Sequence, residues 1–375
     1  MTKTEKLLRE LIALPSVNPA FLPAQDPRAG EQRVAEFLAA TAAHAGLDVE
    51  FQAVAPGRSN LLARLSPSGK VRRRILLAPH MDTVGAADGQ FTPVTRNGRL
   101  FGRGACDTKG SVAAMLTALC ELAQGSPRPA ETEIVFAGLV DEEHDQIGSR
   151  ALAASGLGAD LAIVGEPTRL QVVTAHKGAL WLELETRGRS AHGSCPELGR
   201  NAVHAMARVV DLLETGYAAQ LRRRRHPLLG CATISVGAIR GGIQPNVIPD
   251  RCTILIARRT LPGETETGVR RELNRVLRRK NLAVAYVHDK LLPCPPLETD
   301  PRLPLVARFL SSVGQRKAVG VRYFSDAAVL GRGGIPSVVF GPGDIAQAHT
   351  ADEWISLAAL ERGKELLLRF AQSFS

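Results

Sequence analysis

A histidine and an aspartate, His80 and Asp82, interrupt the apolar run ILLAPHMDTVG at residues 75–85. On an extended chain, residues two positions apart point to the same side, so this imidazole and this carboxylate can address one target. A metal ion is such a target, because His80 could bind it while Asp82 holds the far ring nitrogen of His80. For this short pattern alone, a solvated loop after a strand remains the alternative.

Further acidic residues and a second histidine follow other apolar runs or lie at the start of a helical pattern. They are Asp107 in GRGACDTKG, Glu142 and Glu143 in LVDEEHD, Glu166 in IVGEPT, and His349 in AHTADEWI. Ligands of open α/β sheets collect outside the carboxyl ends of the strands, so we expect these side chains to converge. A Glu-Glu pair alone is usually a solvated face and a lone histidine a surface residue, so the hypothesis depends on the whole set.

The chemistry of this set suits two divalent cations. Asp107, Glu143 and Glu166 supply three negative charges. Imidazoles from the two histidines complete a mixed nitrogen and oxygen shell that fits zinc, with cobalt or manganese as substitutes. One carboxylate must bridge if the ions lie about 3.5 to 4 Å apart, as two-metal hydrolases require. Glu142 then remains free to take a proton from water and pass it to a leaving amine.

The elements that must position these residues alternate between strands and helices. The apolar runs that predict buried parallel strands lie at 74–79, 132–140 and 160–165. The run 109–125 predicts a helix ended by a glycine, which completes an α/β pattern. From about residue 176 the order becomes βαββαβ, which is typical of a two-layer ferredoxin-like α+β unit. We therefore predict an α/β domain formed by 1–175 and 290–375, with a second domain inserted at 176–289.

Composition limits the class of protein. The chain has 375 residues, a formal charge of +10 and six cysteines without a CxxC pair. Scattered cysteines favour reduced thiols and a cytoplasmic location. The first residues predict an amphipathic helix rather than a signal peptide, and no run is long enough to span a membrane. Arginine runs suggest nucleic-acid binding as a remote alternative, but only 4% of residues are aromatic, and no stacking motif accompanies the arginines.

Eight motifs in one order carry a close resemblance to a known family. They are HMDTV, GRGACDTKG, VDEE, VGEPT, GRSAH, GGIQPNVIPD, LPGET and AHTADEWI. They resemble the zinc metallohydrolases that comprise acetylornithine deacetylase, succinyl-diaminopimelate desuccinylase, aminoacylase and glutamate carboxypeptidase, from about residue 5 to the end. The resemblance implies a zinc-peptidase-like catalytic domain with a mixed sheet flanked by helices. It also implies two zinc ions per subunit and a homodimer formed through the inserted domain.

The resemblance assigns a role to each candidate ligand. It implies that His80 and Glu166 bind one metal ion, that Glu143 and His349 bind the other, and that Asp107 bridges the two. Asp82 would support His80 from behind, and Glu142 would act as general base. None of these positions departs from the pattern of the family.

In the predicted insert, the resemblance implies that His192 of GRSAHGS donates a hydrogen bond to the developing oxyanion in the active site of the neighbouring subunit. His192 could instead cap the helix that follows it. Asn246 in IQPNVIP resembles a substrate-binding asparagine, although turn chemistry would also explain it.

Arg259 resembles a substrate-binding arginine. The acidic residue that the family usually has two positions earlier is replaced by Ala257, which leaves open whether Arg259 is a surface arginine. Gly341 and Gly343 resemble a GPG backbone contact to the substrate.

The expected reaction is hydrolysis of a linear amide. Glutamate in VGEPT resembles the deacylase and carboxypeptidase branches, and an N-acyl amino acid presents a carboxylate that Arg259 and a positive field would favour. We therefore expect an acetylornithine deacetylase-like or succinyl-diaminopimelate desuccinylase-like enzyme. The alternatives are a glutamate carboxypeptidase-like or dipeptidase metallopeptidase and, more remotely, a non-catalytic anion-binding or nucleic-acid-binding protein. A membrane partner is not expected.

Overall fold

The computed structural model describes residues 1–125, 128–287 and 292–375 and divides the chain into two compact units. The first unit consists of Met1–Thr174, Thr299–Val319 and Ser325–Ser375, and the second of Ala175–Glu298 and Gly320–Phe324. The second unit starts one residue before the predicted insert. The predicted boundary between residues 289 and 290 lies outside the described residues.

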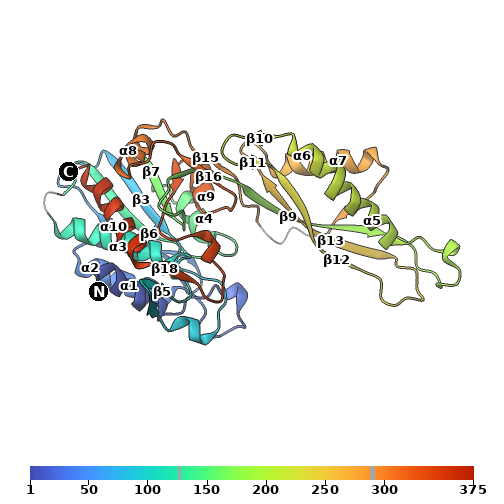
Figure 1. Ribbon diagram of the computed structural model, residues 1–375, viewed down its shortest axis with the longest axis horizontal. Helices are drawn as coiled ribbons and strands as arrows, with labels where there is room; N and C mark the ends of the chain where they lie inside the picture. The colour runs from blue at the N-terminus through green and yellow to red at the C-terminus, as the bar shows by residue number, and fades with distance from the viewer. Residues whose placement is uncertain (126–127, 288–291) are drawn as a thin grey trace. The chain divides into compact units, whose positions relative to one another are not determined.

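The first unit holds most strands of a nine-stranded mixed sheet (Figure 1). Its strands are β1 Asp48–Ala55, β2 Arg58–Leu65, β3 Arg73–Pro79, β6 Thr132–Gly138, β7 Leu161–Gly165, β8 Val173–His176, β15 Leu297–Glu298, β16 Val319–Val321 and β17 Ser337–Val339. The order is β1-β2-β6-β3-β7-β17-β8-β15, with β16 beside β8. Neighbouring strands from β6 to β17 are parallel, whereas β1, β2 and β6 pair antiparallel in that order, and β8 pairs antiparallel with β17 and β15. This mixed sheet confirms the predicted fold class.

Helices flank the sheet because the parallel strands β6 and β7 are buried along their whole length and must be covered on both faces. The helices are α1 Lys3–Ile12, α2 Gln32–His44, α3 Lys109–Gln124, α4 Ile147–Ala154, α8 Pro304–Ser312, α9 Ala327–Arg332 and α10 Leu357–Gln372. The central helix α3 packs against α1 and α10, and it is buried on nearly all sides. This burial explains why its sequence is apolar without a polar face.

A small antiparallel sheet lies apart from the large one in the first unit. It consists of β4 Val94–Arg96, β5 Arg99–Phe101 and β18 Trp354–Ser356, in the order β18-β5-β4. Trp354 pairs with Phe101, so segments that are distant in the sequence leave this sheet side by side.

The second unit is a four-stranded antiparallel sheet with helices on one face. Its main elements are β9 Gly178–Arg187, α5 Ala202–Leu212, α6 Ala218–Arg222, β12 Thr233–Gly241, β13 Arg251–Thr260, α7 Glu266–Arg279 and β14 Ala285–Tyr286, with a short β10 Arg225–His226 and β11 Gly230–Cys231 hairpin. The sheet order is β12-β13-β9-β14. Alternate residues of β13 are buried in a core shared with α5 and α7, which explains the alternating pattern of the sequence. Strand β14 takes the place of the last strand in the predicted βαββαβ order, and residues 288–291, shortly after it, lie outside the described residues.

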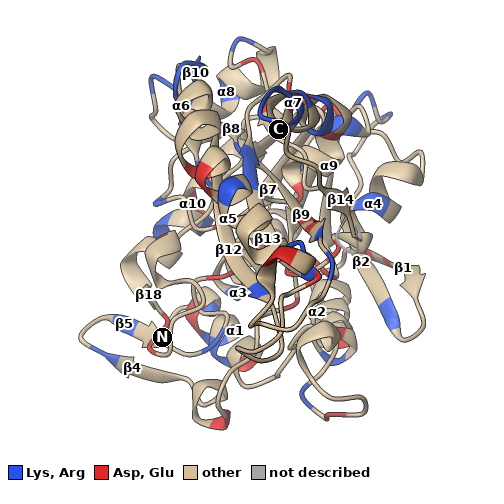
Figure 2. Ribbon diagram, turned by 90° about the vertical axis from the view of Figure 1, so that its right-hand side faces the viewer, with Lys and Arg blue, Asp and Glu red and all other residues tan. Residues whose placement is uncertain are grey.

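Positive charge gathers on helix α7 of the second unit (Figure 2). Arg271, Arg275, Arg278 and Arg279 are exposed there, while Val269, Leu273 and Leu277 are buried on the other side. The arginines therefore follow from the amphipathic period of the helix. Within the described residues, no helix combines the length and the apolar character needed to cross a membrane.

Candidate metal centre

The candidate ligands lie at the carboxyl ends of neighbouring parallel strands. His80 directly follows β3, Glu142 and Glu143 follow β6 after a short connection, and Glu166 directly follows β7. Because β6, β3 and β7 are adjacent and parallel, their ends meet at one edge of the sheet. Asp107 reaches the same place from the loop before α3.

Asp107 lies between the two candidate imidazoles. Its Oδ1 is 3.2 Å from Nε2 of His80, and its Oδ2 is 3.3 Å from Nε2 of His349. The Oε1 atom of Glu166 lies 3.8 Å from His80 Nε2, and Oε2 of Glu143 lies 3.2 Å from His349 Nε2. The side chains therefore form two groups, each with one imidazole, and Asp107 belongs to both.

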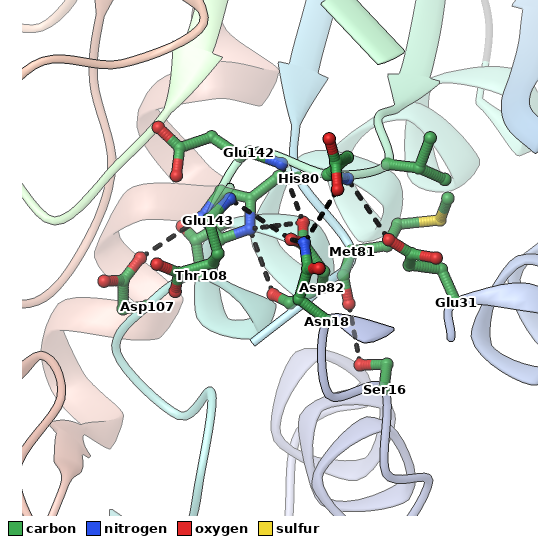
Figure 3. Close-up of polar contacts among 12 residues, drawn as sticks. Ser16, Asn18, Glu31, His80, Met81, Asp82, Asp107, Thr108, Glu142 and Glu143 are labelled. Atoms are coloured by element: carbon green, nitrogen blue, oxygen red, sulfur yellow. Dashed lines mark hydrogen bonds and ion pairs between the residues drawn. The ribbon is translucent and has the colours of Figure 1, made fainter. Parts of the chain in front are cut away.

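Asp82 supports both His80 and the turn that carries the two glutamates (Figure 3). Its Oδ1 is 3.4 Å from Nδ1 of His80, on the far side of the ring from Asp107. Its carboxylate also accepts the backbone N–H groups of Glu142 and Glu143, at 3.1 and 3.2 Å. The contact with His80 was expected from the sequence, and the two backbone hydrogen bonds were not.

Burial and like charge dominate the electrostatics of this cluster. Burial raises the pKa of both Glu142 and Glu166, and the charge of Glu166 raises the pKa of Glu142 further. Hydrogen bonds to Asp107 and Glu143 raise the pKa of His349 to about 10. Ionised together, these carboxylates carry more negative charge than the two imidazoles can balance, so bound cations would stabilise their ionised form.

The donor atoms fit divalent metal ions. Within the described residues, two sets of side chains place ligand atoms within 4.8 Å of one another: His80, Asp107 and Glu143, and His80, Glu142 and Glu166. The Oε1 atom of Glu166 is buried without a hydrogen-bond partner among the described residues, as expected for an oxygen whose partner is a cation. Distance alone does not separate Glu142 from the ligands, so its role must be argued from chemistry.

A buried polar network behind the cluster was not predicted. The side-chain amide nitrogen of Asn18 donates hydrogen bonds to the carboxylates of both Asp82 and Asp141, at 2.7 and 2.9 Å. Arg58 donates to Asp141 at 2.8 Å and forms a two-pronged ion pair with Glu31. Glu31 also accepts the backbone N–H of Asp141 at 3.1 Å, which fixes the turn before Glu142. In the sequence, these residues are isolated polar positions beside apolar runs, and that pattern alone does not indicate a buried network.

Asp326 was also missed. It is fully buried beside the cluster and accepts hydrogen bonds from Ser149 at 2.5 Å and Gln146 at 3.1 Å. Burial raises the pKa of Asp326 to about 6. These bonds hold the start of α4, which continues the turn that carries Glu142 and Glu143.

His192 and Asn246 lie together in the second unit. His192 forms an isolated bridge with Val247, and the neighbouring Gly193 donates its N–H to Asn246 at 2.7 Å. Nδ1 of His192 accepts the Ser194 N–H at 3.2 Å, which leaves the ring proton on the exposed Nε2. This tautomer can donate a hydrogen bond to a ligand.

Arg259 lies at the other end of the same sheet, at the end of β13. Its guanidinium carbon is 5.8 Å from the ring centroid of Phe324. Its Nη1 is buried and has no hydrogen-bond partner in residues 1–125, 128–287 and 292–375. Arg259 is therefore only partly exposed, and a terminal nitrogen remains available for an anion.

Gly341 and Gly343 pack against the residues around the cluster. Gly341 donates its N–H to the Thr168 hydroxyl, and a Cβ there would lie 2.6 Å from the carbonyl oxygen of Glu166. Gly343 has a φ of +93°, and a Cβ there would lie 2.6 Å from Sγ of Cys106. The two glycines allow close approach of the backbone, and contact with a substrate stays a prediction.

Comparisons with known proteins find relatives that match along most of this chain. The model of the family described as Peptidase family M20/M25/M40 matches residues 76–373. Acetylornithine deacetylase of Proteus mirabilis is 32% identical, covering 98% of this chain and 96% of the relative. That of Myxococcus xanthus is 33% identical over 84% of each chain. The crystal structure of an aminopeptidase from Bacillus cereus has a TM-score of 0.81 and 20% identity, over 99% of this chain and 98% of that one, which shows the same fold.

Proposed function

Because the chain belongs to Peptidase family M20/M25/M40, whose members include metal-dependent hydrolases of amide and peptide bonds, we propose that it deacylates an N-acyl amino acid. The observation that carries this proposal is the carboxylate of Asp107 between two imidazoles, surrounded by buried carboxylates. Similarity to acetylornithine deacetylases along nearly the whole chain supports an amino acid with a small acyl group as the substrate class.

The candidate cluster would hold two zinc ions. His80 and Glu166 would bind one, Glu143 and His349 the other, and Asp107 would bridge them. When bound, the ions would polarise the substrate carbonyl and lower the pKa of a water molecule. Asp82 keeps the His80 ring in place and fixes the backbone of the glutamate pair.

Glu142 would move the proton. Its carboxylate is buried and accepts no hydrogen bond from the described residues, whereas its backbone is fixed by Asp82. The raised pKa of Glu142, caused first by burial, suits a group that accepts a proton from water and returns it to the leaving nitrogen. Glu143, which lies 3.2 Å from His349, is better placed to act as a ligand.

The second unit would contribute to the active site of a partner subunit. Arg259 pairs with Ala179 at the start of β9, whereas His192 lies beyond Arg187 at its end. The eight residue steps from 179 to 187 correspond to about 26 Å at about 3.3 Å per residue. A small N-acyl amino acid cannot span this length, so one active site would use His192 and Arg259 from different chains of a homodimer. Arg259 would bind the substrate carboxylate, and Asn246 would act beside His192.

A carboxypeptidase or dipeptidase activity is the second candidate. The unpaired Nη1 of Arg259 would also suit the terminal carboxylate of a peptide. A cytoplasmic location, which the scattered cysteines without a CxxC pair favour, is part of the same proposal.

The deciding experiment is a substrate screen with zinc-loaded protein. Acetyl-ornithine, acetyl-lysine, succinyl-diaminopimelate and dipeptides are compared by kcat/KM, with the Glu142→Ala variant as control for contaminating activity. We expect an N-acyl amino acid to be hydrolysed fastest. Faster hydrolysis of dipeptides would favour the second candidate, and absence of hydrolysis of every compound by metal-loaded protein would contradict the deacylase proposal.

A further inference from the structure

His349 has a different kind of support from the other candidate ligands. His80 and Glu166 directly follow strands of the large sheet, whereas His349 comes ten residues after Val339, the last residue of β17. Its side chain is 54% exposed, and its backbone has a φ of +61°. A feature outside the large sheet must therefore hold it beside Asp107.

A buried carboxylate joins the two segments concerned. Glu353 is 1% exposed, and its Oε1 accepts the backbone N–H groups of Cys106 and Asp107 at 2.8 and 2.9 Å. Its Oε2 accepts the N–H of Gly104 at 3.0 Å and Nη1 of Arg103 at 2.7 Å. One carboxylate thus fixes the loop that ends at Asp107 through four hydrogen bonds.

The Arg103 side chain extends this connection toward His349. Arg103 is 4% exposed, and its Nη2 donates to the carbonyl oxygen of Thr350 at 3.2 Å. The side chain of Gln90 donates to the same oxygen at 3.2 Å, and the backbone carbonyl of Gln90 accepts the backbone N–H of Arg103 at 2.8 Å. Thr350 directly follows His349, so these bonds fix the backbone next to the imidazole.

Both segments start from the small sheet. Phe101 pairs with Trp354, and Gly102 donates its N–H to the carbonyl of Glu353 at 3.0 Å. The loop 102–107 follows β5 and the segment 349–353 precedes β18, so both border the same pair of strands. The ion pair between Arg103 and Glu353 joins them a second time.

We propose that Glu353 and Arg103 are positioning residues that set the separation of Asp107 and His349, and so the geometry of the metal site that these two ligands share. The inference rests on the proposed metal-dependent function. It assigns the small sheet β18-β5-β4 a role in ligand placement. Neither residue contacts the substrate or the reacting atoms in this proposal.

The Glu353→Gln variant tests this role with little change in size. Its amide nitrogen would face N–H donors, so one pair of the four hydrogen bonds must be lost. We expect zinc affinity, measured by competition with a chromophoric chelator, to fall about 10- to 100-fold. We also expect kcat per metal-loaded subunit to fall while KM changes little. The visible spectrum of cobalt-loaded protein should change as well.

The matched control is Glu133→Gln. Glu133 is also buried and forms an ion pair with Arg74, but it lies near the start of β6, away from the carboxyl ends of the strands. The Glu133→Gln substitution removes the same charge from a similar ion pair. Because that pair lies away from the candidate ligands, the substitution should alter neither zinc affinity nor the cobalt spectrum. Equal losses in both glutamine variants would show that the effect is general destabilisation and would overturn the proposal.

The Arg103→Lys variant keeps the charge but loses the fork that reaches both Glu353 and Thr350. We expect a smaller loss of zinc affinity in the same direction, and this variant decides the question if Glu353→Gln does not fold. Unchanged zinc affinity and kcat in both Glu353→Gln and Arg103→Lys would overturn the positioning role. Failure of the wild-type protein to bind two metal ions or to hydrolyse amides would instead contradict the proposed function.

Discussion

Replacement of Arg58 by methionine should destabilise the first unit strongly at neutral pH. The Arg58 side chain is 14% exposed, and its partners Glu31 and Asp141 are 1% and 3% exposed. Removal of one partner of a buried ion pair costs about 3 to 5 kcal/mol, because a charge is left without compensation. We expect the free energy of unfolding of Arg58→Met to fall by this amount.

The pH dependence of this loss follows from Glu31. Burial raises the pKa of Glu31 above 4.5, although the hydrogen bond from Arg58 opposes the shift. Without Arg58 the pKa must rise further. A carboxyl whose pKa is raised by folding binds more protons in the native state, so stability falls as pH rises through this window. The difference between wild type and Arg58→Met should therefore be largest at neutral pH and shrink as pH falls toward 4.5.

Tryptophan fluorescence can follow the unit concerned. The chain has two tryptophans, and Trp354 lies in the first unit whereas Trp181 lies in the second. In a Trp181→Phe background, urea unfolding in excess chelator reports on the first unit without a contribution from metal binding. The double variant Glu31→Gln with Arg58→Met should recover part of the lost stability, because it also removes the Glu31 charge that has lost its partner. A loss below about 1 kcal/mol, or a loss that does not change between pH 7 and pH 5, would refute this reasoning.

Three further predictions concern the proposed reaction. Chelation should abolish hydrolysis and zinc should restore it, and fully active protein with less than one metal ion per chain would contradict the two-metal site. Glu143→Ala should bind less metal, whereas Glu142→Ala should keep both ions and lose turnover by several orders of magnitude; the reverse pattern in metal analysis would exchange the two roles. Glu142→Ala and His192→Ala subunits, each nearly inactive alone, should recover about a quarter of wild-type activity after random exchange, because half the dimers are hybrids with one intact site of two. No recovery after confirmed exchange would mean that His192 does not act in the partner's site.

Local rules were sufficient to predict the position of most candidate ligands. His80 and Asp82 follow from the alternation of side chains on an extended chain, and Glu166 follows from the end of an apolar strand. The βαββαβ order of the second unit was likewise readable from the change of hydrophobic period. These features depend on residues that are close in the sequence.

The supporting residues could not be predicted in the same way. Glu353 and Asp107 are 246 positions apart, and Arg58 and Asp141 are 83 apart, so no local pattern connects them. A single glutamate or arginine in a sequence looks like a surface residue, because burial of its charge depends on partners that only the fold brings near. The placement of β17 between β7 and β8 is equally non-local.

The position of β17 has a consequence for the order in which a newly made chain can fold. During synthesis the second unit, apart from residues 320–324, is complete once Glu298 has left the ribosome, while the large sheet still lacks the strand that joins β7 to β8. That gap closes only with Ser337–Val339, and His349, β18 and α10 come later still. A nascent chain therefore carries the candidate ligands His80, Asp107, Glu143 and Glu166 for nearly half its length before the last candidate ligand, His349, is made. Under the proposed assignment, metal capture by the complete cluster would follow synthesis of nearly the whole chain and would not guide it.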